Sequence, residues 1–485
     1  MLFSNSNFDF TMIKFFKIII PIFLLYFFYS CEKEEINTSI DANLLFSEDT
    51  ISFDTIFTSI GSATQRFTVK NPYQKNLKIN SIELAGGESS PYRLNIDGYP
   101  GYRLENVELR EKDSLYIFVE VTIDPNSTNL PMVVKDSIIF SFNNKQEDID
   151  LIAFGQNVHL IKSQCRLSII ESDTNWGNDK PYLIYDSLLI TPNNTLTIES
   201  GTHLYFHKSS RLYVAGTIKA NGTFESPIIF QGDRLESDFE DVPGQWDGIW
   251  LMPGSKDNVL NFTEIKNAII GIQVDTFANE AKPTLTLSNS RIENMAYAGI
   301  YAQGTTIEAY NNLITNCGQY AVALNIGGNY KFYHCTIANY WGYSTRTTPS
   351  VIINNYYIDV NNNIQIRDIT NALFGNCIIY GNKESELFID KAPESESGLL
   401  NFKFDHTLIK VDKEFSTADP DHFEKVLVNK DPNFIDPYGG EFELDTLSIA
   451  KDYGKEEYGI QFDYDLNMNS RISDIGPDLG AFERQ

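Results

Sequence analysis

The residues from Leu196 to Gly232 constrain the fold more than any other stretch of this chain. They contain pairs of apolar residues spaced two apart, and short runs of turn residues separate the pairs. The pairs are Leu196/Ile198, Leu204/Phe206, Leu212/Val214, Ile218/Ala220 and Ile228/Phe230. A spacing of two puts both members on one face of a β-strand, and each run is too short for a helix. The Asn-Gly turn at 221–222 also allows antiparallel hairpins, so the continuation of the pattern decides between hairpins and a coil of parallel strands.

The pattern continues downstream with a regular period. A polar pair followed by a short apolar strand recurs, and its isoleucines are Ile265, Ile292, Ile314, Ile337 and Ile379. Their separations are 27, 22, 23 and 42 residues. A period of about 20–25 residues is typical of a solenoid, in which 42 residues are two turns or one turn with an insertion. We therefore expect parallel strands that stack roughly 4.8 Å apart.

Two residue types recur in the polar pair, and both have a structural interpretation. Asparagine stands there at 289, 311, 312 and 376; it tolerates a left-handed backbone at a tight turn and can bond its stacked neighbour. Cys335 and Cys377 occupy the same place. They are expected as buried thiols, because free cysteine packs as a compact hydrophobe, although a disulfide is possible where the two coils adjoin.

The opening stretch and the end of the chain resemble a known fold. Leu196-Thr197-Ile198 and Gly216-Thr217-Ile218 resemble the first coils of right-handed parallel β-helix proteins of the pectate-lyase-like fold. The end, Asp474-Ile475-Gly476 to Glu483, resembles the closing segment of secreted β-helix proteins. The resemblance implies a right-handed parallel β-helix over 162–434 and a C-terminal cap over 435–485. A cap is needed because the last coil exposes its apolar interior and an unpaired strand edge.

Residues 49–161 predict a separate β-sandwich. Strand-like runs at 65–69, 77–79, 114–121 and 136–142 are separated by turn residues, as in a two-sheet sandwich. The segments Val69-Lys70-Asn71 and Ala153-Phe154-Gly155 resemble those of an immunoglobulin-like domain, which implies a spacer or a partner-binding module. The fold class expected for the whole chain is therefore all-β.

The first 31 residues predict where in the cell the protein is sent. Lys14 and Lys17 precede an uncharged apolar run over 18–29, which is typical of a secretory signal and short for a membrane span. Tyr29-Ser30-Cys31 resembles a bacterial lipoprotein signal, which implies lipidation of Cys31 and attachment to the membrane. The acidic run 32–35 resembles the tag that directs some lipoproteins to the outer face of the outer membrane. Residues 32–48 are then a tether, and an uncleaved signal anchor is the alternative.

Composition and spacing argue against nucleic acid as a partner and show no zinc-site pattern. Asp and Glu number 65 against 38 Lys and Arg, a formal net charge of -27 at pH 7, and no basic cluster interrupts the acidity. Such a surface repels nucleic acid. The five cysteines show no zinc-site spacing, and no Ser/His/Asp or phosphate-loop pattern occurs.

Two insertions between strands offer candidate ligand-binding residues, since loops carry function on a solenoid. The first, 232–250, supplies Asp233, Asp238, Asp241, Trp246, Asp247 and Trp250, and the second, 339–369, supplies Trp341, Tyr343 and Arg346. Carboxylates could bind Ca²⁺ or act as an acid/base pair on a sugar, and aromatic rings could form a carbohydrate platform. A solvated acidic loop, packed tryptophans and an aromatic cap are the structural alternatives. The segment 244–249 resembles a β-helix rung start, which favours the structural interpretation.

The pattern favours a cell-surface lipoprotein that binds glycan or another envelope or extracellular component. A polysaccharide lyase or glycoside hydrolase is the alternative, and a structural or adhesive protein is the second. Two carboxylates in mutual reach, or a carboxylate beside Arg or Lys, would favour the enzyme. An aromatic face without such a pair would favour binding.

Overall fold

The computed structural model describes residues 35–126, 132–275, 282–393, 397–473 and 475–484. These residues form two compact units: one contains the described residues up to 125 and 132–156, and the other contains Asn126 and the described residues from 157 onward. The predicted signal and Cys31 lie outside the described residues. Among the described helices, none has the length and apolar character needed to cross a membrane.

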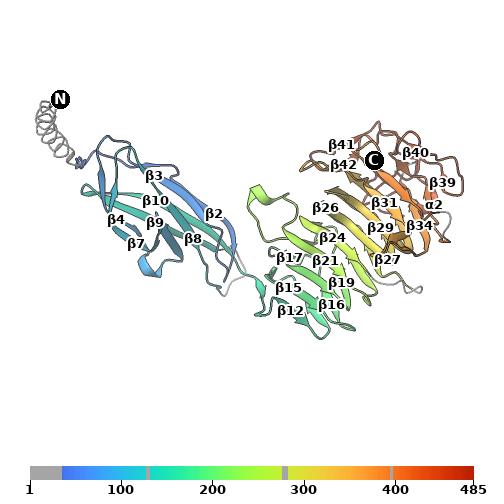
Figure 1. Cartoon of the computed structure of the whole chain (residues 1–485), viewed down its shortest axis with the longest axis horizontal. Coiled ribbons are helices and arrows are strands. Elements are labelled where there is room, and N and C mark those ends of the chain that lie inside the picture. Colours follow the sequence, from blue (N-terminus) through green and yellow to red (C-terminus); the bar gives the residue numbers. More distant parts are fainter. Residues whose placement is uncertain (1–34, 127–131, 276–281, 394–396, 474, 485) are drawn as a thin grey trace, which may run out of the picture. The chain divides into compact units, whose positions relative to one another are not determined.

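The first unit is a sandwich of two five-stranded sheets (Figure 1). One sheet has the order β1 (Leu45–Phe46), β3 (Gln65–Lys70), β8 (Ser114–Val121), β5 (Tyr92–Ile96), β6 (Tyr99–Gly101). The other has the order β2 (Thr50–Phe57), β10 (Lys145–Gln156), β9 (Met132–Phe142), β4 (Leu77–Leu84), β7 (Arg103–Leu109), and η1 (Gly87–Ser89) follows β4. Neighbours are antiparallel except β2 and β10, which are parallel. The strands predicted in this region are all present, and their alternating apolar residues form one core.

The predicted tether differs from the structure in its described part. Leu44 is only 6% exposed and Ala42 is also buried in the sandwich core. β1 pairs with β3 through Leu45 and Phe46. The chain from Ile36 to Phe46 therefore belongs to the sandwich, because its short alternation of apolar and polar residues is sufficient for an edge strand.

The second unit is a coil of parallel strands arranged in three columns, which we call A, B and C in the order in which each turn visits them. Column A contains β12 (Leu167–Ile170), β15 (Ser187–Ile190), β18 (Arg211–Val214), β21 (Trp246–Leu251), β24 (Ala268–Val274), the first halves of β27 (Ala298–Tyr310) and β29 (Tyr320–Tyr333), β31 (Val351–Asn354) and β36 (Leu387–Asp390). Column B contains β13 (Thr174–Trp176), β16 (Thr195–Ile198), β19 (Thr217–Asn221), β22 (Asn258–Asn261), β25 (Leu285–Ser288), the second halves of β27 and β29, β34 (Ile369–Gly375), β37 (Lys403–Asp405) and β39 (Phe423–Glu424).

Column C contains β11 (His159–Ile161), β14 (Tyr182–Ile184), β17 (His203–Phe206), β20 (Ile228–Gly232), β23 (Thr263–Lys266), β26 (Arg291–Met295), β28 (Leu313–Cys317), β30 (Thr336–Asn339), β35 (Ile378–Gly381), β38 (Leu408–Ile409) and β40 (Leu427–Val428). Outside the columns lie η2 (Ser237–Phe239), the hairpin β32 (Tyr356–Ile358) and β33 (Ile364–Ile366), the hairpin β41 (Phe434–Asp436) and β42 (Glu441–Leu444), and α2 (Glu456–Gln461).

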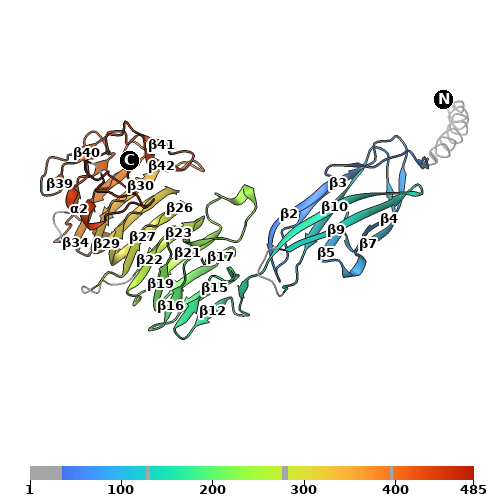
Figure 2. The ribbon, with the colours of Figure 1, turned by 180° about the vertical axis from the view of Figure 1, so that it is seen from behind.

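The opening stretch forms the predicted coil and not hairpins. Its five apolar pairs lie on β16 to β20 and are buried in one continuous core. β16 pairs in parallel with β19, and β17 pairs in parallel with β20, one turn of the coil later. Figure 1 and Figure 2 show this stacking from opposite sides, with β15, β21 and β27 following one another along the coil.

The polar pairs form the tight corner between columns B and C. Asn289, Asn311 and Asn376 have left-handed φ values of 48°, 54° and 51°, and the Nδ2 of Asn311 donates to Oδ1 of Asn289 at 3.1 Å. The asparagine ladder is thus structural, as predicted. Cys335 and Cys377 are buried as free thiols on adjoining turns, where the Cys335 amide donates to the Cys377 sulfur at 3.5 Å.

The C-terminal segment lies along the side of the coil. Its buried apolar residues, which include Phe442, Leu466 and Leu479, pack on the outward residues Leu313 of β28 and Leu408 of β38. Its packing is therefore lateral, whereas we expected a cap over the last coil. The reason is visible in column C, where apolar residues stand on both faces of the last strands and the outer ones need a cover.

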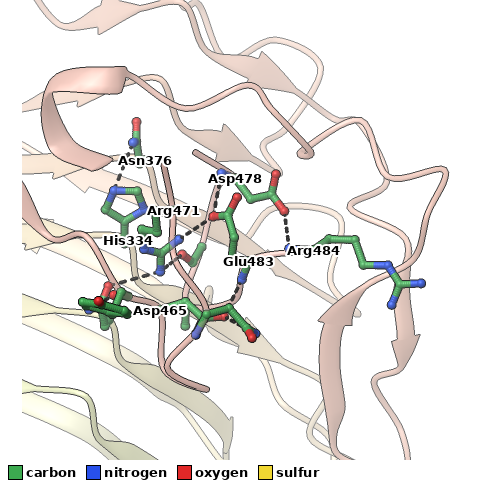
Figure 3. A network of polar contacts seen from close by, with 12 residues as sticks. His334, Asn376, Asp465, Arg471, Asp478, Glu483 and Arg484 are labelled. Atoms are coloured by element: carbon green, nitrogen blue, oxygen red, sulfur yellow. Dashed lines mark hydrogen bonds and ion pairs between the residues drawn. The ribbon is translucent and has the colours of Figure 1, made fainter. Parts of the chain in front are cut away.

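A buried network fastens this segment to the coil (Figure 3). The guanidinium of Arg471 donates to Oδ1 of Asn311 at 3.1 Å and pairs with Glu483 at 3.3 Å. The Glu483 amide donates to Asp465 at 2.7 Å. Asn311 lies at the corner between β27 and β28, so these contacts tie the segment to the coil several turns before its last strands, across 160 positions of sequence.

Candidate functional site

Of the candidate residues in the first insertion, some are buried in the core and others lie at the surface. Trp246 is fully buried, stacks on Phe206 at 4.1 Å, and its indole N–H donates to the Lys266 carbonyl at 2.9 Å. It cannot reach a ligand, which corrects its assignment as a candidate binding residue. Asp233 pairs with Nδ1 of His207 at 2.6 Å, and Asp238 is exposed in η2.

The two insertions meet at the corner between columns C and A. The Tyr343 hydroxyl donates to the carbonyl oxygen of Asp241 at 2.7 Å, and the Asn294 amide donates to the Asp241 carboxylate at 3.0 Å. The sequence did not predict this contact across 102 positions. Among the described residues no set of three or more His, Cys, Asp or Glu side chains is arranged to hold a metal ion.

The second insertion is held mainly by buried contacts. Trp341 is buried and its indole N–H donates to Ser344 at 3.0 Å, whereas Tyr343 is 55% exposed. Arg346 is buried and pairs through both terminal nitrogens with the two oxygens of Glu386, at 2.7 and 2.8 Å. Arg346 is thus a structural residue, which also corrects its assignment as a candidate for ligand binding.

Asp247 and Trp250 lie on the outer face of column A, and four residues that the sequence analysis missed join them. In-register pairing places Tyr213 of β18 beside Trp250 of β21, and Trp250 beside Gln273 of β24. We call the following residues the Trp250 cluster: Arg211, Tyr213, Asp247, Trp250, Gln273 and Asp275. Arg211 and Tyr213 lie outside both insertions, but they alternate with the core residues Leu212 and Val214 of a predicted strand, and that alternation is the sequence signal for their outward face.

Aromatic rings and an arginine lie close together in the Trp250 cluster. The ring centres of Tyr213 and Trp250 are 5.6 Å apart. The Arg211 guanidinium carbon lies 6.0 Å from the Tyr213 ring centre and 5.7 Å from that of Trp250. Its Nε is 3.9 Å from the Asp247 carboxylate, so a cation lies beside both a carboxylate and two π faces.

The cluster also contains buried polar atoms that lack a hydrogen-bond partner among the described residues. Arg211 Nε, Trp250 Nε1 and Asp275 Oδ1 are buried and form no hydrogen bond within the described chain. Burial raises the pKa of Asp275 above its usual range, against the lowering effects of the Gln273 amide, the Trp250 indole and Arg211. The indole thus lies near Asp275 without reaching hydrogen-bonding geometry.

Tyrosines continue this face along the coil. Tyr301 of β27 is in register with Gln273, and Tyr297 lies between Tyr301 and Tyr320, at 6.0 and 6.2 Å between ring centres. From β18 to β29 the face crosses four steps of roughly 4.8 Å, or about 19 Å. The arrangement suits an extended ligand with alternating apolar and hydroxyl-bearing surfaces.

Comparison with known proteins supports the fold. A family model described as a right handed beta helix region matches residues 271–403, and with the parallel columns it identifies the coil as a right-handed parallel β-helix. No curated protein matches the chain.

Two solved structures show weak likeness. A family 123 glycoside hydrolase from Clostridium perfringens is 9% identical, with 28% of this chain and 30% of that chain covered and a TM-score of 0.18. The Salmonella enterica SafA pilin in complex with the SafB chaperone is 12% identical, with 25% and 58% covered and a TM-score of 0.16. This chain thus spans less than two thirds of either, and at these TM-scores neither carries an argument.

Proposed function

We propose that this protein is a lipoprotein of the bacterial outer membrane surface, anchored through Cys31, whose β-helix binds glycan along the outer face of column A. The sandwich serves as an immunoglobulin-like spacer between the anchor and the coil. The signal-like leader supports the proposed location at the outer membrane, and the Trp250 cluster supports glycan as the ligand. The single observation that carries the binding site is the Tyr213–Trp250 pair on the outer face of column A, with the Arg211 guanidinium beside it.

The chemistry of the cluster fits a sugar chain. A pyranose ring presents an apolar face of C–H groups and an edge of hydroxyls, and Trp250 and Tyr213 offer apolar rings while Asp275, Arg211 and Gln273 offer acceptors and donors. Clustering of aromatic rings with a few convergent polar groups is the usual composition of a ligand site. The net acidity of the chain disfavours strongly anionic glycans.

Glycan-array binding followed by titration tests the site. Trp250→Ala and Tyr213→Ala should each weaken binding by roughly tenfold or more, about 1.4 kcal/mol, without loss of the fold. Tyr116→Ala is a matched control, because Tyr116 is an exposed aromatic with Arg66 5.4 Å from its ring centre, but on the sandwich. Equal weakening by the control, or none by the two cluster variants, would contradict the proposal.

An enzyme acting on glycan is the second candidate, favoured by the arginine–carboxylate arrangement. Arg211 lies beside Asp247, and the raised pKa of Asp275 suits a proton donor. A reducing-sugar assay and an unsaturated-product assay on the bound glycans distinguish the two. If turnover occurs, Asp275→Asn should abolish it while binding persists. An absence of products with every bound glycan leaves the binding protein as the function.

The anchor has its own test. Cys31→Ser should move the full-length protein from the membrane fraction to the soluble fraction, because the lipid acceptor is lost. Cys165→Ser is the control, since Cys165 is the exposed free cysteine of the described chain. Protease digestion of intact cells should remove the wild-type protein if it faces outward.

A further inference from the structure

A groove of about 610 Å³ lies between the C-terminal segment and column B. Aromatic side chains from both sides line it: Phe262 and Tyr310 from the coil, Phe462 and Tyr464 from the C-terminal segment. Glu308 of β27 and Asp463 add two carboxylates to the lining. The groove is separate from the Trp250 cluster, which lies on the outer face of column A.

The walls of the groove are fixed before any ligand arrives. Phe462 stacks on Tyr310 with ring centres 4.6 Å apart. The Asn311 amide donates to the Tyr464 carbonyl at 2.8 Å, and the buried Arg471 holds the other end of that amide. Preorganised walls of this kind reduce the entropy lost on binding.

Phe262 is an exception at its corner of the coil. It has φ 47°, in the left-handed region where the following turns carry Asn289 and Asn311. A bulky residue in this conformation carries backbone strain, which asparagine largely avoids. A phenylalanine there gives the groove an aromatic wall that asparagine would not provide.

The acidic residues of the groove favour a cationic ligand. Among the described residues that line it, Glu308 and Asp463 are acidic and none is basic. Neither carboxylate forms a hydrogen bond or an ion pair with another described residue, and Tyr464 is 47% exposed. Aromatic faces and unpaired carboxylates together attract an ammonium group through cation–π and Coulomb interactions.

We propose that this groove binds a protonated amino sugar of a glycan chain, with Glu308 and Asp463 facing the ammonium group and the aromatic side chains facing the sugar ring. The choice of a sugar rests on the proposed function, whereas the preference for a cation comes from the groove itself. The preference for a cation makes the groove a second glycan site, with a specificity different from that of the column A site.

Calorimetric titration of the whole mature chain with a glucosamine tetramer and with its fully N-acetylated counterpart tests the proposal. The two probes have the same backbone and differ in charge, so at mildly acidic pH the glucosamine tetramer should bind at least about tenfold more tightly. Glu308→Gln and Tyr464→Ala should each weaken its binding by a similar factor. Added salt should weaken it too.

Two variants separate this inference from the proposed function. Trp250→Ala should leave the preference for the glucosamine tetramer over its N-acetylated counterpart intact, because that preference comes from the groove. Glu441→Gln, an exposed acidic change on β42, is the charge-matched control. The proposal for the groove would be overturned by equal affinity for the two tetramers. It would also be overturned if Glu308→Gln and Tyr464→Ala had no effect in chains that melt at the wild-type temperature. Glucosamine binding that responds to the groove variants while no glycan responds to Trp250→Ala would overturn the column A site alone.

Discussion

At the scale of single residues, two tryptophans four positions apart have opposite roles. Trp246 fills the core of the coil and Trp250 faces outward. We expect Trp246→Ala to lower the free energy of unfolding by about 3–5 kcal/mol because it leaves a large cavity. Trp250→Ala should cost roughly 1 kcal/mol or less in stability, but weaken glycan binding on column A by roughly tenfold. Denaturant titration beside binding assays checks both, and a reversal of the two effects would contradict the assigned faces.

His334 makes the stability of the coil depend on pH. Burial and the neighbouring Arg471 hold its pKa well below the usual range. Below about pH 6.5 the unfolded chain takes up a proton at this residue that the folded chain does not, so stability is lost as the pH falls.

His334→Asn should flatten this part of the pH profile. Asparagine already occupies the equivalent left-handed corner at 289, 311 and 376, so the fold should persist. Thermal melts between pH 7 and pH 5 should show a smaller decline for the variant than for the wild type. Parallel profiles would mean that His334 becomes protonated in the folded protein.

At the scale of elements, a buried ion pair holds the second insertion to Glu386, the residue that precedes β36. Arg346 is paired with Glu386, which also accepts from the Ser350 hydroxyl at 2.6 Å. Arg346→Met leaves the carboxylate buried without its cation, and we expect a loss of about 3–5 kcal/mol in urea titrations. The double variant with Glu386→Leu should recover part of it. A loss of under about 1 kcal/mol for the single variant would show that water reaches the pair.

The outer faces of the strands also explain where the C-terminal segment lies. On β23 and β26 the outward residues include Glu264 and Arg291, whereas on β28, β35 and β38 they are Leu313, Ile378 and Leu408. In these late strands an outward apolar residue stands directly beside an inward one, so both faces of the strand are apolar. Such a pair of adjacent apolar residues is a sequence signal that another segment covers the outer face. It identifies the covered face but not the segment that covers it.

At the scale of the whole molecule, the sandwich and the coil have separate hydrophobic cores. We expect two calorimetric transitions for the chain without its leader, and a fragment of residues 157–485 should keep the coil's melting temperature. It should also keep glycan affinity, since both proposed sites belong to the coil. A fragment that melts much lower would show that the sandwich stabilises the coil directly.

The sequence by itself determined the parts of this protein that depend on local periodicity. Pairs such as Leu204/Phe206 specify an inward face, and the corner asparagines specify tight turns; stacking them at one period leaves a parallel coil as the consistent solution. It also predicted Asp247 and Trp250 as candidate site residues, and the structure places both on an outer face.

Only the tertiary structure decided which side chains meet. Trp246 and Trp250 are equally aromatic, and strand register alone separates core from surface. The Trp250 cluster joins Arg211 to Asp275 across three turns of the coil, and Arg471 meets Asn311 across 160 positions. Contacts of this kind depend on how turns of unequal length bring strands into register, which a pattern along the chain does not encode.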